Sequence, residues 1–186
     1  MYYEDIVVIL LLKLEAILEP KEAKKVKLDQ IDHRILHDLQ ARGRVTNVEL
    51  ARRAGISAPP CLRRVRALEE DGFIHGYHAD LDASKLGFKE MFFALVGLSS
   101  QSQTVLKDFE ELVSDWPQVR ECHMLRGDAD FLLKIVARDK DQRDELTMKL
   151  TSTKDVIKVT TLETIRTSKD VPGVPVEEGT LETDSL

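Results

Sequence analysis

The chain has 186 residues and a formal net charge of −6 at pH 7, and a change in composition along it favours two small domains over one large one. Its two cysteines, Cys61 and Cys122, fall one in each half, which argues against a structural disulfide and predicts reduced thiols. The apolar run from Ile6 to Leu12 is too short to cross a bilayer and follows acids rather than the basic start of a signal peptide. We therefore expect a cytoplasmic protein that has no membrane partner.

Residues 1–25 form an extension of uncertain role, either an additional helix that packs on a dimer or the remnant of an upstream start. The first clear helical pattern runs from about 29 to 42 and ends at Gly43. Its apolar face contains Ile31, Ile35, Leu36 and Leu39. His33 and His37 have i, i+4 spacing on the polar face, where histidines are more often solvated than metal-bound, so we expect no metal site.

Two short helices follow, separated by Gly55. Thr46 and Glu49 have the S/T-x-x-E spacing of a capping box, which predicts the start of the first helix. Its candidate inward residues are Val48, Leu50, Ala51 and Ala54. Ser57 can cap the second helix, and the Pro-Pro pair after it falls in the first turn, where missing N–H groups cost no hydrogen bond. Its inward stripe is Cys61, Val65 and Leu68. The three helices together predict a small helical domain over residues 26–78.

Positive charge is concentrated in this helical part. Between residues 42 and 66 there are seven arginines and a single acid, Glu49, a balance of +6 in a chain of net charge −6. The arginines are Arg42, Arg44, Arg52, Arg53, Arg63, Arg64 and Arg66. Such a local excess is the electrostatic footprint of a surface that approaches phosphates, and the two-helix arrangement is that of a helix-turn-helix. Basic amphipathic helices are also common as solvated faces, so the pattern alone leaves both readings open.

The remaining residues predict a second domain of alternating strands and helices. Residues 73–81 alternate like a strand or an arm, residues 79–90 form a linker, and residues 91–169 hold the domain. Strands are expected over 91–98, 119–125, 131–137 and 157–165, and helices over 105–113 and 140–150. The order βαββαβ predicts a ferredoxin-like sheet with both helices on one face, hence an α+β chain. Residues 170–186 are acidic, rich in Gly, Pro, Thr and Ser, and expected to be disordered.

In the strands around Phe92 and Phe131, apolar residues occur at odd and even positions alike, and so on both faces of the strand. A strand with one solvated face would alternate more cleanly, so the face without helices needs cover. A second copy of the chain is the expected cover, which predicts a homodimer.

Five segments in order resemble the Lrp/AsnC family of transcription regulators, and especially its leucine-responsive branch. They are LDQIDHRIL from Leu28, NVELA from Asn47, CLRRVRALE from Cys61, GFIHGY from Gly72 and ECHMLRGDADFLL from Glu121. The resemblance covers residues 26–169. It implies a winged or plain helix-turn-helix joined to a βαββαβ effector-binding domain, dimers that assemble further into octamers, and binding to double-stranded DNA at a degenerate palindrome. It also implies control of amino-acid metabolism genes.

The resemblance makes 57–71 the recognition helix. The implied DNA-contacting residues are Ser57, Pro59, Arg63, Arg64 and Arg66, with Arg52 and Arg53 on the preceding helix. Arginine is the side chain suited to bidentate contact with guanine, so Arg63 is assigned to base edges and Arg64 to the DNA backbone. Arg63 replaces an acidic residue common in close relatives, which implies a changed sequence preference.

The implied effector site is the turn after the second strand of the regulatory domain, and the effector is an amino acid, leucine or another. Its residues are Met124, Arg126, Gly127, Asp128 and Asp130. Gly127 would let free amides approach an α-carboxylate, and Asp128 or Asp130 would meet the α-ammonium. The alternative is a plain β-turn in which Asp130 only leads into the strand. Ala129 replaces a frequent aromatic, so leucine is not assumed.

Three other functions are less favoured by the sequence. Haem-precursor decarboxylases resemble the same two-domain fold, and His123 and Arg126 lie in the right region, but such enzymes need no basic recognition helix. A stand-alone amino-acid sensor would not bind duplex DNA. The strand at 131–137 lacks the aromatic pattern of RNA-recognition sheets. No catalytic or nucleotide-binding motif occurs, so we expect neither an enzyme nor a cofactor.

Overall fold

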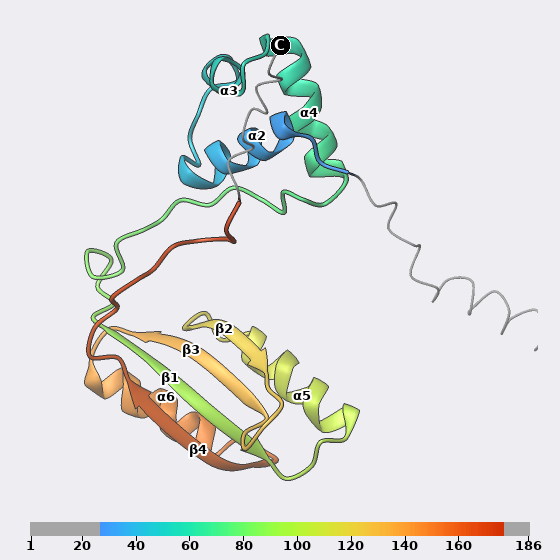
Figure 1. Cartoon of the computed structure of the whole chain (residues 1–186). Helices are drawn as coiled ribbons and strands as arrows, with labels where there is room; N and C mark the ends of the chain where they lie inside the picture. The colour runs from blue at the N-terminus through green and yellow to red at the C-terminus, as the bar shows by residue number, and fades with distance from the viewer. Residues whose placement is uncertain (1–26, 177–186) are drawn as a thin grey trace, which may run out of the picture. The chain divides into compact units, whose positions relative to one another are not determined.

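The computed structural model describes residues 27–176, which divide into two compact units (Figure 1). One contains residues 27–79 together with 172–176, and the other contains residues 80–171. The extension at 1–25 and most of the acidic tail lie outside the described residues. Among the described residues, no helix is both long and apolar enough to cross a membrane.

The first unit consists of three helices, α2 (Gln30–Ala41), α3 (Asn47–Ala54) and α4 (Ala58–Glu70), as predicted. Most of the expected inward residues form the core, which contains Ile35, Leu50, Ala51, Ala54, Cys61, Val65 and Leu68. The other predicted residues of the first helix, Ile31, Leu36 and Leu39, pack against this core and are partly buried. The expectation for Val48 was wrong, because its side chain is 71% exposed. Val48 lies in the first turn of a helix of only two turns, where a periodic pattern has little length in which to fix the phase.

Helices α3 and α4 start at the predicted cap residues, Thr46 and Ser57, but the side-chain cap bonds differ from those expected. Thr46 accepts a hydrogen bond from the Glu49 backbone N–H at 3.2 Å, but the reciprocal half of the capping box is not formed. Ser57 is the N-cap residue of α4 without a side-chain cap bond. The complete capping box is at Asp29 and Asp32 before α2, where each carboxylate accepts a backbone N–H of the other residue. Gly55 ends α3 as expected, with φ of 77° in the left-handed region.

The segment after α4 is an extended coil. No strand forms between residues 27 and 89, so residues 73–81 are an arm rather than a strand. The Tyr77 hydroxyl donates to the Glu69 carboxylate at 2.9 Å, which ties the arm back to α4. Burial, and then this hydrogen bond, raise the pKa of Tyr77 to about 12.

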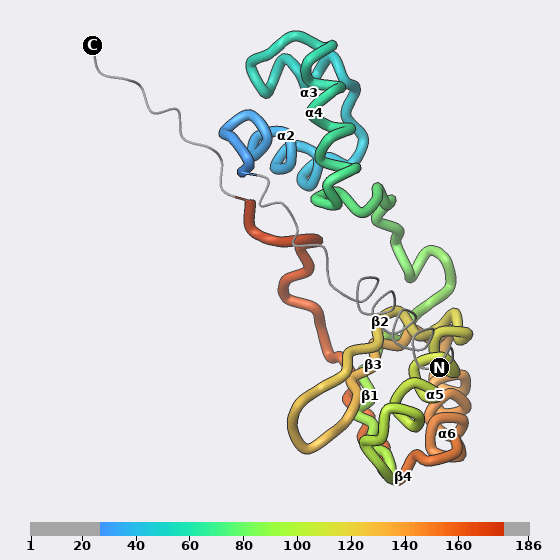
Figure 2. The backbone as a smooth tube through the Cα atoms, turned by 90° about the vertical axis from the view of Figure 1, so that its right-hand side faces the viewer, coloured from blue at the N-terminus to red at the C-terminus, as the bar shows by residue number. Residues whose placement is uncertain are grey.

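The second unit is the predicted βαββαβ sheet. Its elements are β1 (Glu90–Leu98), α5 (Gln103–Ser114), β2 (Val119–Met124), β3 (Phe131–Ala137), α6 (Lys140–Thr151) and β4 (Val156–Glu163). The strands are antiparallel in the order β2-β3-β1-β4. Both helices cover one face, and Figure 2 shows them side by side on the same side of the strands. Alternate residues of β1 and β3 form the core with Phe109, Val113 and Leu150.

The other face of the sheet has no helix on it. Phe93 and Leu95 of β1 and Val136 of β3 point to this face and are partly exposed, and Leu162 of β4 is 46% exposed. The apolar surface that the sequence placed on this face is therefore present. We name Phe93, Leu95, Leu132, Val136 and Leu162 the open sheet face.

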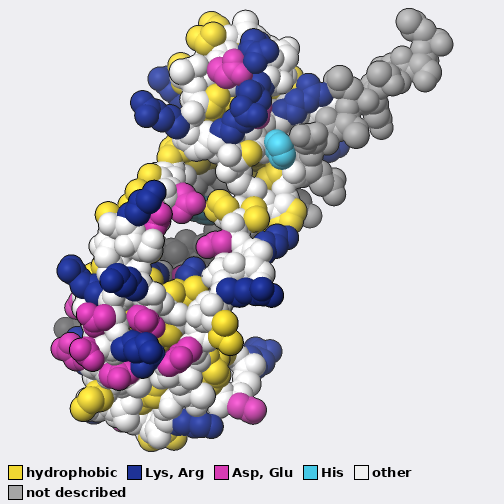
Figure 3. Space-filling model, turned by 90° about the vertical axis from the view of Figure 1, so that its left-hand side faces the viewer, with side chains coloured by type: hydrophobic (Ala, Val, Ile, Leu, Met, Phe, Trp, Pro, Cys, Tyr) yellow, Lys and Arg dark blue, Asp and Glu magenta, His cyan; other side chains and the backbone are white. Residues whose placement is uncertain are grey.

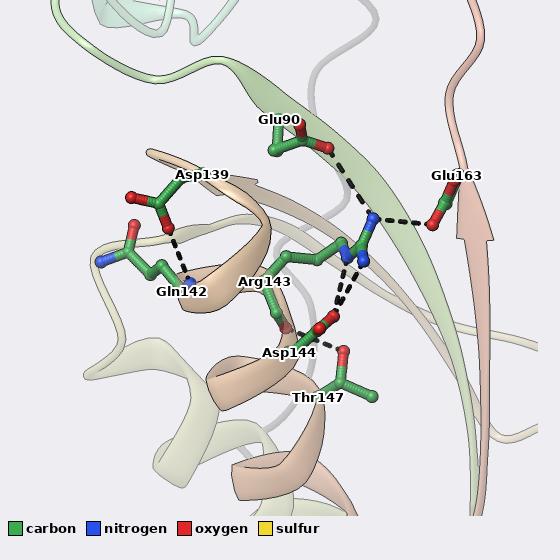
Figure 4. Close-up of polar contacts among 7 residues, drawn as sticks. All are labelled: Glu90, Asp139, Gln142, Arg143, Asp144, Thr147 and Glu163. Atoms are coloured by element: carbon green, nitrogen blue, oxygen red, sulfur yellow. Dashed lines mark hydrogen bonds and ion pairs between the residues drawn. The ribbon is translucent and has the colours of Figure 1, made fainter.

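One arginine ties together the start of β1, the end of β4 and α6 (Figure 4). The Arg143 guanidinium lies 2.7 Å from Glu163, 2.9 Å from Asp144 and 3.9 Å from Glu90. Its side chain is only 15% exposed. The hydrogen bond with Asp144 raises the pKa of Arg143 further above its ordinary value.

We expect Arg143→Ala to lower the thermal midpoint of this unit, because three carboxylates would lose their shared counter-charge. Arg143→Lys should fall between the alanine variant and the wild type, since lysine keeps the charge but not the planar fork. Lys107→Ala is the control, because it removes a single exposed pair with Glu111. Calorimetry at low and high salt measures the thermal midpoints of the variants. Equal midpoints for Arg143→Ala and Lys107→Ala would exclude a stabilising role for the contacts of Arg143 with Glu163, Asp144 and Glu90.

Candidate functional site

The exposed side of α4 presents two arginines that the fold does not use. The inward stripe buries Cys61, Val65 and Leu68, which turns Arg63 and Arg66 to the solvent. Within residues 27–176, neither guanidinium makes an ion pair or hydrogen bond. In Figure 3, Lys and Arg predominate among the charged side chains of the upper, helical unit on the face in view. Two unpaired guanidinium groups on one helix form a surface suited to phosphates and guanine edges.

Arg64 is engaged inside the protein. Its Nη1 lies 2.8 Å from Asp32 and 2.8 Å from Asp29, the two residues of the α2 capping box. Its hydrogen bond with Asp32, and a second with Asp29, raise the pKa of Arg64. The side chain therefore fixes α4 against the start of α2, a contact between residues more than thirty positions apart that sequence pattern did not indicate.

The arginines of α3 share the single acid of the basic stretch. Glu49 accepts hydrogen bonds from Arg52 Nε at 2.9 Å and from Arg53 Nε at 2.7 Å, and Arg53 also lies 3.6 Å from Asp38. The hydrogen bond from Arg52, followed by that from Arg53, lowers the pKa of Glu49 to about 2. The Arg52 side chain is 70% exposed, so it can still face an outside anion. Ser57 and Pro59, at the start of α4, are exposed.

The turn that the sequence assigned to an effector, residues 125–130, lies between β2 and β3, and Asp130 holds its end. We call it the β2–β3 turn, or effector turn, after that prediction. The Asp130 carboxylate accepts from the Leu98 backbone N–H at 2.6 Å and from Gln101 Nε2 at 3.1 Å. Its backbone N–H donates to Val96 at 2.9 Å, and its carbonyl accepts from Leu125 at 2.8 Å. Asp130 thus joins the turn to the end of β1, which is a structural role beyond leading into the strand. Gln101 is a member of this cluster that the sequence did not reveal.

The tip of the turn is open. Met124, Arg126, Gly127 and Asp128 are exposed, and in the described part of the chain the charged groups of Arg126 and Asp128 have no ion pair. A side-chain Cβ at Gly127 would meet no atom within 4 Å, so the described chain does not itself require glycine there. The turn therefore offers the cation of Arg126, the anion of Asp128 and an unobstructed backbone at Gly127, next to the hydrogen-bonded Asp130.

We expect Asp128→Ala to reduce amino-acid binding with little change in stability, because its carboxylate supports no internal contact. Asp130→Ala should instead lower the thermal midpoint together with ligand affinity, since it leaves the Leu98 N–H without its acceptor. Calorimetric titration and thermal melting of both variants separate the two effects. If Asp130→Ala changed neither ligand affinity nor assembly, its place in the effector site would be wrong.

A separate concavity of about 450 Å³ lies between α5 and the end of α6. Its apolar wall includes Phe109, Leu112 and Trp116, and the Lys149 ammonium lies 3.7 Å from the centre of the Trp116 ring. No residue of the effector turn lines it.

The described residues do not meet the requirements of a metal site or of a reactive thiol. Among residues 27–176 there is no cluster of three His, Cys, Asp or Glu side chains able to hold a metal ion. Burial raises the pKa of both Cys61 and Cys122, which disfavours the reactive thiolate. His123, which the decarboxylase alternative would use, hydrogen-bonds Glu121 at 3.0 Å on the open side of the sheet.

Known families match both units. Residues 28–75 match winged helix-turn-helix DNA-binding domains, and residues 91–174 match the Lrp/AsnC ligand binding domain. The leucine-responsive regulatory protein of Rhizobium meliloti is 51% identical over 153 residues, which cover 82% of this chain and 98% of that protein. The leucine-responsive regulatory protein of Escherichia coli is 44% identical over 107 residues, covering 58% of this chain and 65% of that protein.

Solved structures of similar fold cover most of the chain. An AsnC family transcriptional regulator from Agrobacterium tumefaciens has a TM-score of 0.75 at 32% identity, covering 80% of this chain and 97% of that one. A transcriptional regulator from Neisseria meningitidis in complex with L-Met has a TM-score of 0.76 at 31% identity, with the same coverage. A helix-turn-helix unit joined to a βαββαβ ligand-binding unit defines a DNA-binding transcription regulator.

The chain belongs to the Lrp/AsnC family. The family resemblance and fold class predicted from the sequence are confirmed. Because the relatives are transcription regulators, the chain is a regulator and not a decarboxylase-like enzyme.

Proposed function

We propose that this regulator reads DNA with α4, with Arg63 at base edges and Arg66 beside it. The observation that carries the proposal is that these two exposed guanidinium groups have no partner within the described residues. Ser57 and Pro59 lie at the end of α4 that would enter the groove first, and Arg52 would face the flanking phosphates. Arg53 would reach a phosphate only by sharing its guanidinium with Glu49 and Asp38. Arg64 would contact the DNA backbone only by sharing its guanidinium with Asp29 and Asp32. The target genes are those of amino-acid metabolism, and the site of action is the cytoplasm.

The working unit is a homodimer formed through the open sheet face, and dimers assemble further into octamers. The apolar side chains of that face support the dimer. Two recognition helices related by a two-fold axis read symmetric half-sites, so the operator is a degenerate palindrome.

The effector is an amino acid bound at the turn between β2 and β3. Its α-ammonium meets Asp128, and its α-carboxylate meets Arg126 or the exposed backbone beside Gly127. Support comes from the open tip of the turn and from the L-Met complex of the similar Neisseria meningitidis regulator. Leucine, methionine or another amino acid fits this chemistry equally well, since the turn recognises the groups that they share.

The experiment is fluorescence anisotropy with the chain's own upstream promoter DNA and a scrambled duplex, at ~150 mM salt, with and without pooled amino acids. We expect tighter binding to the promoter than to the scrambled DNA, and a shift caused by one pool. Equal affinity for both duplexes under every condition would contradict sequence-specific regulation. Absence of duplex binding even at low salt would favour a stand-alone sensor.

A further inference from the structure

The C-terminal segment is attached to the DNA-binding unit. The Gln40 side-chain amide of α2 makes two hydrogen bonds with the backbone of Val174: Nε2 donates to the carbonyl at 2.6 Å, and Oε1 accepts from the N–H at 3.2 Å. The neighbouring Gly173 has φ of 78°, and a Cβ there would overlap the Gln40 amide. Glycine is thus required at this contact, both for its backbone conformation and for space. The anchor fixes where the following residues begin.

The residues that follow the anchor carry one sign of charge. Residues 177–186 contain Glu177, Glu178, Glu182 and Asp184 and no Lys or Arg. In the same unit, Arg63 and Arg66 of α4 have no ion-pair partner among the described residues. An acidic segment that follows an anchor on α2, and a helix of the same unit with unpaired arginines, are charge-complementary.

The chain length permits contact. Ten residues of random-coil chain have a root-mean-square end-to-end distance of roughly 16 to 19 Å. Helix α4, with its 13 residues, is about 20 Å long. A tether of this length gives the acids an effective concentration in the millimolar range at α4.

We propose that residues 177–186 bind the Arg63 and Arg66 face of α4 in the absence of DNA, and that DNA phosphates must displace them. The acidic tail is therefore an intramolecular competitor that weakens DNA binding, most of all for non-specific DNA, which offers phosphates alone. This inference depends on the proposed assignment of Arg63 and Arg66 to the DNA-binding surface.

The test uses full-length chains that differ in tail charge. The variant Glu177→Gln, Glu178→Gln, Glu182→Gln, Asp184→Asn should bind random duplex roughly threefold to tenfold more tightly than wild type at ~50 mM salt, with the gain lost near ~200 mM. The control neutralises four exposed acids of the other unit, Glu110→Gln, Asp115→Asn, Asp141→Asn and Glu145→Gln. An equal gain in the control would show a net-charge effect and overturn the inference.

A second variant leaves the charge unchanged. Gly173→Ala should remove the anchor and give part of the same gain, because the tail stays attached to the chain but at a lower effective concentration near α4. A Gly173→Ala protein with wild-type DNA affinity would show that the anchor has no part in the competition.

A double-mutant cycle separates the two proposals. If Arg63→Ala with Arg66→Ala leaves affinity for all DNA unchanged, the proposed DNA-binding surface is wrong. A second outcome is that the double variant weakens DNA binding while neutralisation of the tail still raises DNA affinity by the full amount in that variant. The proposed DNA-binding surface would then be right, and the tail would act at another site. Loss of the gain in that background is the expected result.

Discussion

Arg63→Ala should weaken binding to the specific operator by about 1 to 3 kcal/mol, roughly 5-fold to 150-fold, and change affinity for random duplex much less. The reason is geometric: α4 turns Arg63 to the solvent and gives it no internal partner, so its fork is free for a guanine edge. Anisotropy titrations with the operator and with single-base variants of it measure the loss. On an operator in which the base read by Arg63 is changed, wild type and Arg63→Ala should bind with equal affinity. The position at which this occurs identifies the base that Arg63 reads.

Arg64→Ala is the matched control for Arg63→Ala, since it removes the neighbouring guanidinium of the same helix. It should lower the thermal midpoint of the helical unit, because Asp29 and Asp32 would lose their shared cation. Discrimination between operator and random DNA should survive in the folded protein. An Arg63→Ala protein that loses affinity for both DNAs in equal measure would rule out base reading by this residue.

Leu95→Glu should convert the protein to a monomer of 21.1 kDa and abolish tight operator binding. Leu95 lies on the central strand β1 and points to the open sheet face, where a carboxylate in each copy would be buried against the other. Separation of the copies removes the bivalent contribution to DNA affinity, which is worth about 10² to 10⁴. Light scattering at micromolar concentration and operator titration report the two effects.

Met148→Glu is the control for the dimer prediction. Met148 is 72% exposed on α6, on the helix-covered side of the sheet, so its replacement should leave the dimer intact. Circular dichroism confirms that both variants are folded. A Leu95→Glu protein that stays dimeric, or a wild type that is monomeric at micromolar concentration, would contradict dimer formation through the open sheet face.

The order and type of every described helix and strand were predicted from the sequence, most directly where the apolar period is clear, as in β1, β3 and α5. The strand β2 and the helix α6 have little apolar periodicity of their own, and their place in the βαββαβ order supported their prediction. The sequence was less informative about side-chain partners. The spacing of Thr46 and Glu49 matches a capping box, yet two arginines at i+3 and i+4 take the Glu49 carboxylate, because a guanidinium brings a full positive charge and a fork of N–H donors. Local pattern therefore predicted the helix start and not the contact.

Non-local contacts explain the remaining differences at the candidate site. Arg64 looks like its neighbours in sequence, and only the packing of α2 against α4 gives it Asp29 and Asp32. For Asp130 the sequence left two roles open, contact with the ammonium of a ligand or simple entry into the strand. Its bonds to Leu98 and Gln101 depend on the β1–β3 pairing, which brings together residues about thirty positions apart.

The open sheet face also has a charged corner. Lys134 of β3 lies opposite Glu121 of β2 in register, and its ammonium is 2.9 Å from the Glu121 carboxylate, which also accepts from His123. In the proposed dimer, a partner that covers this pair must offer it polar groups or remove water from charges that only partly compensate each other. A partner surface with only apolar side chains opposite this corner would therefore dock less favourably than one with polar groups there. In the proposed dimer, these three side chains would contribute to the choice of partner.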